Sequence, residues 1–285
     1  MTTCADASRA ASEPLGGTGI VAERWLCVES RAPWGRDAIT DGGHDPDVAA
    51  WLAAHDAKVL AIRRPGSRSG PVRVFAARPA ETGRGELRTL ALDDLASLPG
   101  TDPWVDGAPV DGTLLLVCAH GRRDACCSRL GVPVFSALDA ARGRATGGEG
   151  PLTWQCSHTG GHRFAPNVVA LPWGVTLGRV DRADAQRLIA LLGEGRVPLD
   201  TYRGRSLYPA AGQAAEVAVR RALGLDRLDA LRLVGADDAG TWTFTSPDGG
   251  SVAARVTEVE GPTLPKSCGA EPGPVAVHRA RLLTE

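Results

Sequence analysis

An α/β fold is predicted by three observations on this sequence of 285 residues. Short apolar runs rich in β-branched residues, the pattern of buried strands, alternate along the chain with segments of helical spacing. Stretches rich in glycine and proline separate these segments, as connecting loops do. With 43% hydrophobic residues, the chain can bury a sizeable core in one large or two small domains.

The N-terminal part is expected to open with a flexible arm over residues 1–20, which is rich in Ser, Gly and Ala. An α/β region follows over residues 21–108. Its predicted strands cover residues 24–29, 58–62, 72–76 and 86–92. Between the first two strands, Asp45 and Pro46 supply an N-cap and a first-turn proline for a short helix. The Pro-, Gly- and Asp-rich stretch 100–112 marks the boundary to the next domain.

The central domain is predicted over residues 109–198. It starts with the continuous apolar strand 113–117 and a helix at 128–142. Short strands follow at 152–155, 168–171 and 174–178, and Asp181 caps a second helix. The order strand, helix, strand, loop, strand, strand and helix is that of a thioredoxin-like domain.

A small α+β subdomain is predicted over residues 199–285. Its helix covers 211–223 and ends at Gly224. Strands at 242–245 and 252–259 flank Asp248-Gly249-Gly250, which predicts a β-hairpin. The proline-containing last residues are expected to form an extended tail.

The composition excludes several classes of partner. A net charge of −1 offers no basic face for nucleic acid. No apolar run approaches the ~20 residues that cross a membrane, and residues 1–14 lack the apolar core of a secretory signal. We therefore expect a cytoplasmic protein, in which cysteines stay reduced and clustered ones bind metal or take part in redox chemistry.

Soft metal ligands gather after two of the central strands. The strand at 113–117 leads into Cys118-Ala-His-Gly-Arg-Arg-Asp-Ala-Cys126-Cys127, and the strand at 152–155 leads into Cys156-Ser-His158-Thr-Gly-Gly-His162. The two glycines disfavour a helix and let the backbone approach a bound group closely. Imidazoles on either side of them indicate that this group is a metal.

Two kinds of centre fit two cysteines and two histidines. Structural zinc sites use this set, but their cysteines stand two to four residues apart, whereas eight residues separate Cys118 from Cys127. A [2Fe–2S] cluster also takes two Cys and two His, as Rieske centres do. The longer spacing favours the larger group.

The two motifs resemble the sucrase/ferredoxin-like family, whose members are similar to thioredoxin-like ferredoxins with His-x-x-x-His in place of the second cysteine pair. This resemblance implies Cys118, Cys127, His158 and His162 as ligands of a [2Fe–2S] cluster. It leaves Cys126 as the alternative to Cys127, and Cys156 as a substitute ligand.

Charged residues next to the ligands are expected to surround the site. Arg123 and Arg163 would stabilise an added electron or guide an acidic partner, and Asp124 would fix the loop. Cys4, Cys27 and Cys268 are treated as ordinary cysteines outside the site.

Three functions follow from these residues. The first is an electron carrier, rather than an enzyme with its own substrate, that serves an unidentified redox partner. Its imidazole ligands would raise the reduction potential and couple electron transfer to proton release. The second is a thiol–disulfide protein that uses Cys126 and Cys127, although it lacks the Cys-x-x-Cys motif. The third is a structural zinc module that presents the C-terminal subdomain to a partner.

Overall fold

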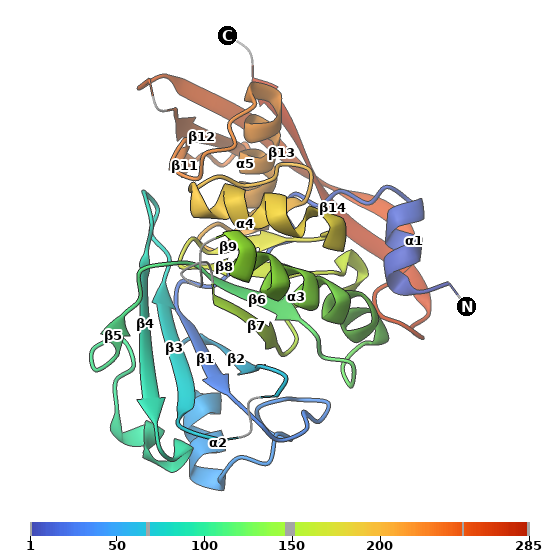
Figure 1. The fold of residues 1–285 in the computed structure, drawn as a ribbon. Coiled ribbons are helices and arrows are strands. Elements are labelled where there is room, and N and C mark those ends of the chain that lie inside the picture. Colours follow the sequence, from blue (N-terminus) through green and yellow to red (C-terminus); the bar gives the residue numbers. More distant parts are fainter. Residues whose placement is uncertain (1, 67–68, 146–151, 247, 284–285) are drawn as a thin grey trace.

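The computed structural model describes residues 2–66, 69–145, 152–246 and 248–283. A ten-stranded mixed sheet forms the body of the protein, in the order β10-β9-β8-β6-β7-β2-β1-β3-β4-β5. A second sheet has four strands in the order β11-β12-β13-β14 (Figure 1). None of the helices among the described residues could span a lipid bilayer.

The N-terminal region forms one half of the large sheet. Its elements are β1 (Trp25–Glu29), α2 (Pro46–Ala54), β2 (Lys58–Arg63), β3 (Val72–Arg78), β4 (Glu86–Leu92), η1 (Leu95–Gly100) and β5 (Ala108–Pro109). Strand β1 is buried along its whole length, and it pairs parallel to β2 and antiparallel to β3. The side chain of Asp45 caps α2, as its place before Pro46 predicts.

The other half follows the predicted thioredoxin-like order. Its elements are β6 (Leu114–Cys118), α3 (Ala125–Ala145), β7 (Leu152–Cys156), η2 (His162–Phe164), β8 (Val168–Leu171), β9 (Val175–Leu177), η3 (Arg182–Asp184) and α4 (Ala185–Gly193). Strand β6 runs parallel to β7 and antiparallel to β8. Apolar side chains of α3 and α4 pack on one face of these strands. Helix α3 starts at Ala125 and not at residue 128, so both neighbouring cysteines lie in its first turn.

The two halves repeat one topology. Each has a strand–helix–strand–strand–strand order, and its second strand lies beside the first, giving β2-β1-β3-β4 and β7-β6-β8-β9. The second strands meet edge to edge, because β2 and β7 pair antiparallel through Ile62 with Cys156 and Arg63 with Gln155. One continuous sheet therefore runs through both halves.

The C-terminal region extends the large sheet and then forms the small one. Its elements are β10 (Tyr202–Arg205), α5 (Ala210–Leu223), β11 (Arg232–Ala236), β12 (Thr241–Thr245), β13 (Ser251–Pro265) and β14 (Pro272–Leu283). The tail that we expected to be extended forms β14, which pairs antiparallel to β13 and so belongs to the small sheet. The long β13–β14 hairpin ends beside α1, near the N-terminus of the chain (Figure 1).

A helix lies within residues 2–20, and the expectation of a flexible arm is wrong for this part of the chain. This helix is α1 (Cys4–Ala10), where Thr3 and Asp6 make a reciprocal capping box. Cys4 and Ala5 are buried against Cys126 of α3. Long-range packing thus orders a segment whose composition is that of an arm.

Candidate metal centre

Two thiols and an imidazole meet where strands β6 and β7 end. Cys118 is the last residue of β6, Cys127 comes from the first turn of α3, and His158 follows β7. One ligand atom from each of these residues lies within 4.8 Å of the other two. Both cysteines are 1% exposed, whereas His158 is half-buried. The carboxyl ends of two parallel neighbouring strands therefore build the site.

The fourth predicted ligand, His162, lies against the third. The rings of His158 and His162 stack with centroids 4.9 Å apart and an angle of 30° between their planes. The Nδ1 atom of each ring is buried, and neither has a hydrogen-bond partner among the described residues. The Nε2 atom of His162 lies 3.8 Å from Oδ2 of Asp124. A ring with one free nitrogen, whose other nitrogen faces a carboxylate, is typical of a metal-binding histidine.

The local electrostatics favour a thiolate at Cys118. Hydrogen bonding by the Cys127 thiol lowers the pKa of Cys118 well below its ordinary value, and burial opposes this shift. The His158 ring and the backbone N–H of Thr159 lower the same pKa further. The thiolate is the form of cysteine that binds metals, so a low pKa at Cys118 favours the binding of a metal cation.

Neither alternative ligand belongs to the group of Cys118, Cys127 and His158, although Cys156 lies opposite Cys118 in the β6–β7 register. The Sγ atom of Cys126 points to a different group of cysteines, where it lies 3.6 Å from Sγ of Cys4 and 3.1 Å from Sγ of Cys268. Cys156 is fully buried, and burial raises its pKa well above the ordinary value. Cys4 and Cys268, which we expected to be ordinary cysteines outside the site, lie outside it but join Cys126 in a second group.

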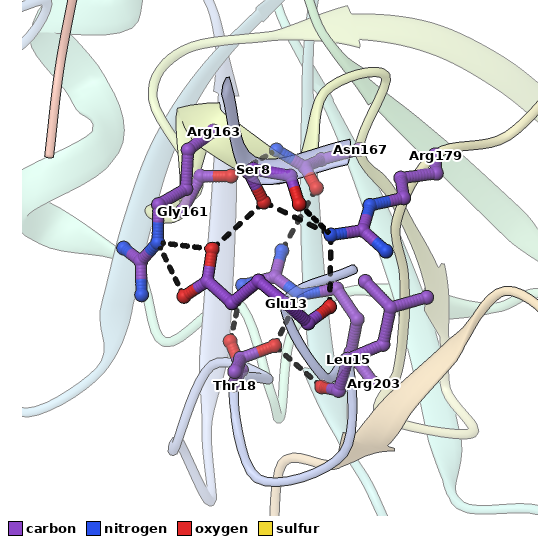
Figure 2. Close-up of polar contacts among 9 residues, drawn as sticks. All are labelled: Ser8, Glu13, Leu15, Thr18, Gly161, Arg163, Asn167, Arg179 and Arg203. Atoms are coloured by element: carbon purple, nitrogen blue, oxygen red, sulfur yellow. Dashed lines mark hydrogen bonds and ion pairs between the residues drawn. The ribbon is translucent and has the colours of Figure 1, made fainter. Parts of the chain in front are cut away.

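A hydrogen-bonded chain holds the histidine loop (Figure 2). Gly161 has a left-handed backbone with φ +63°, and its carbonyl accepts a hydrogen bond of 2.9 Å from Nδ2 of Asn167. Oδ1 of Asn167 in turn accepts one of 2.8 Å from Arg203, and Nε of Arg203 donates to the Thr18 hydroxyl at 3.0 Å. Burial lowers the pKa of Arg203 to about 9, which leaves it charged at neutral pH.

A second set of contacts joins the same loop to the N-terminal segment. Nε of Arg163 donates to both carboxylate oxygens of Glu13, at 2.8 and 3.0 Å, and the Ser8 hydroxyl donates to Glu13 at 2.7 Å. Arg179 donates to the Ser8 hydroxyl and to the Glu13 carbonyl (Figure 2). Arg163 thus supports the loop through an ion pair.

Asp124 and Arg123, which we also expected around the site, differ in burial. Asp124 is buried and faces His162, whereas Arg123 is an exposed side chain in the turn before α3. Sequence reasoning assigned no role to Glu13 or Arg203, because each is far in sequence from the cysteine and histidine motifs.

Comparisons with known proteins give one family and a few partial likenesses. A family model described as sucrase/ferredoxin-like matches residues 15–204. "Altered inheritance of mitochondria protein 32" of Meyerozyma guilliermondii is 34% identical over 95 residues, which are 32% of this chain and 34% of that protein. The chain thus spans about a third of the length of this curated relative.

Two solved structures resemble part of the chain. One is a thioredoxin-like [2Fe-2S] ferredoxin from Aquifex aeolicus, with 19% identity and a TM-score of 0.32, matched over 35% of this chain and 97% of its own. The other is a single-residue variant of a thioredoxin-like [2Fe-2S] ferredoxin from the same organism, with 19% identity and a TM-score of 0.30 over 33% of this chain and 99% of its own.

Proposed function

This chain belongs to the sucrase/ferredoxin-like family, and we propose that it is an electron-transfer protein with a [2Fe–2S] cluster. The ligands would be Cys118, Cys127, His158 and His162. The observation that carries this proposal is the convergence of two buried thiols and the His158 imidazole where β6 and β7 end. The His162 ring stacks on His158, and Nδ1 of neither ring has a hydrogen-bond partner among the described residues.

The donor set suits such a cluster. Two cysteines and two histidines are the ligands of Rieske centres, in which both imidazoles bind the same iron. The rings of His158 and His162 stack on each other, which fits two imidazoles on one iron and two thiolates on the other. When bound, the cluster would accept one electron and give it up again.

The residues around the ligands have distinct roles in this proposal. Asp124 would fix the ring orientation of His162 and strengthen its basicity. The left-handed glycines 160 and 161 let the loop turn tightly between the two histidines. The histidine side of the site is the more exposed side, since His162 keeps 15% of its side chain accessible while both cysteines are 1% exposed. A redox partner protein would therefore dock over the imidazoles.

The thiol–disulfide alternative loses its premise, because Cys126 and Cys127 belong to different groups of side chains. A zinc ion at the four ligands is the remaining competitor. The coupling of electron transfer to proton release and the cytoplasmic location stay predictions. A reduction potential that does not change between about pH 6 and 10 would argue against the coupling.

The proposal is tested by an absorption spectrum of protein purified without air. Iron and acid-labile sulfide are assayed on the same sample. We expect brown protein with about two irons and two sulfides per chain. Cys127→Ser and His158→Ala should lose both. The control Cys156→Ser, which changes a buried cysteine that packs beside Cys118 and Cys127 without belonging to the ligand group, should keep them. Colourless protein whose zinc depends on Cys127 and His158 would show a zinc site in place of the cluster.

A further inference from the structure

A second group of thiols lies beside the proposed cluster site. Cys4 is the first residue of α1, Cys126 is in the first turn of α3, and Cys268 lies in the turn between β13 and β14. Their Sγ atoms are 3.6 Å (Cys4–Cys126), 3.6 Å (Cys4–Cys268) and 3.1 Å (Cys126–Cys268) apart. Three cysteines that are far apart in the sequence therefore meet at one point.

A carboxylate completes this group. The two oxygens of Asp124 accept hydrogen bonds of 2.8 Å from the backbone N–H groups of Cys126 and Cys268. Both oxygens also lie 3.9 Å from Sγ of Cys4. One donor atom from each of the four residues lies within 4.8 Å of the other three. Cys4 and Cys126 are 1% exposed and Asp124 is 5% exposed, so water reaches little of this group.

The spacing of the sulfurs suits a tetrahedral metal ion. Zinc–sulfur bonds of about 2.3 Å in a tetrahedron place the sulfurs about 3.8 Å from one another. The distances of 3.1 to 3.6 Å are close to this value and well beyond the ~2.05 Å of a disulfide bond. Three thiols and a carboxylate are also ligands that zinc takes in proteins.

We propose that Cys4, Cys126, Cys268 and Asp124 bind a zinc ion, at a metal site separate from the four ligands of the cluster. A dication is the partner that converts such buried thiols to thiolates, since the metal displaces their protons.

The position of this ion gives it a structural role. It would tie α1 and the tip of the β13–β14 hairpin to the start of α3, one residue before the cluster ligand Cys127. The sequence separations are 122 residues from Cys4 to Cys126 and 142 from Cys126 to Cys268. Closing loops of this length restricts the unfolded chain, so the metal would stabilise the fold of both chain ends.

Adjacent cysteines provide a matched pair of variants. Full-length protein is purified anaerobically, and zinc and iron are counted by mass spectrometry on one sample. Cys126→Ser should lose about one zinc per chain and keep its iron, whereas Cys127→Ser should lose iron and keep zinc. Cys268→Ser changes a half-buried turn residue, so it should lose only zinc while its iron absorbance shows that it is folded. The core variant Cys27→Ala should keep both metals.

Three results would overturn the zinc site. The first is wild-type protein without zinc that takes none up from a zinc-buffered solution. The second is a disulfide joining Cys126 to Cys268 in alkylated, unreduced protein purified without air. The third is zinc that Cys268→Ser retains. Two zincs and no iron, with one zinc lost in Cys268→Ser, would uphold this site and overturn the proposed cluster, so the two failures are distinguishable.

Discussion

The buried carboxylate of Glu13 offers a direct test of how the histidine loop is held. Its side chain is 1% exposed and pairs with Arg163, which follows His162 directly in the loop. Replacement Glu13→Ala removes both hydrogen bonds from Nε of Arg163 and the one from the Ser8 hydroxyl. The guanidinium of Arg163 then lacks this carboxylate while most of its side chain stays buried.

The magnitude follows from the burial of both partners. Removing one member of a buried ion pair costs about 3–5 kcal/mol, because the other charge stays away from water. Arg163 keeps 19% of its side chain exposed, so water recovers part of this cost and the expected loss of unfolding free energy is about 3 kcal/mol. Exposed Glu23 provides the matched control, and Glu23→Ala should change the unfolding free energy by less than about 0.5 kcal/mol.

The effect is measured by urea unfolding of the wild type, Glu13→Ala and Glu23→Ala. A double-mutant cycle combines Glu13→Ala with Arg163→Ala. We expect Glu13→Ala to cost at least about 1 kcal/mol less when Arg163 is already alanine. An equal cost in both backgrounds would refute the assignment of the loss to this ion pair, and it would point to packing around Glu13 instead.

Two further predictions concern backbone and core. Gly161→Ala places a Cβ against Arg203 at φ +63°, whereas at Gly160, with φ +80°, a Cβ meets nothing within 4 Å. Gly160→Ala should therefore cost only the left-handed strain of about 1–2 kcal/mol, while Gly161→Ala should cost more and lose iron, as unfolding and iron assays would show. The fully buried pair of Arg220 and Glu216, 2.9 Å apart, predicts that Arg220→Met loses about 3–5 kcal/mol of unfolding free energy. Adding Glu216→Gln should recover part of it, and a double variant as unstable as the single one would contradict the prediction.

The buried strands at the centre of both halves could be predicted because their residues are apolar over a strand's length, whereas the short edge strand β5 falls in the stretch predicted as a loop. The run at residues 114–117 is fully buried between neighbours on both sides, which is the environment that a continuous apolar pattern indicates. The ends of helices were less predictable. Helix α3 gains a first turn from Ala125 that its periodic apolar positions do not include.

Strand β10 shows why pattern reasoning fails where charge is buried. Its Arg203 and Arg205 are 1% and 0% exposed, so a rule that places arginines on the surface excludes this strand from the sheet. Both side chains find partners that only the fold supplies: Arg203 bonds to Asn167, and Arg205 donates to the carbonyls of Glu81 and Leu228. These hydrogen bonds offset part of the cost of burial.

The surroundings of Cys126 and Cys127 could be predicted from the sequence only in part. Successive residues of a helix point about 100° apart, so Cys126 and Cys127 in the first turn of α3 cannot face the same centre. The helix predicted from residue 128 did not include them, so it is the structure that places Cys127 toward the strand ends and Cys126 toward α1. The destination of Cys126 depends on Cys4 and Cys268, which no local motif joins to it. Because tertiary packing alone brings these three thiols together, the second metal site that we propose could be found only from the folded chain.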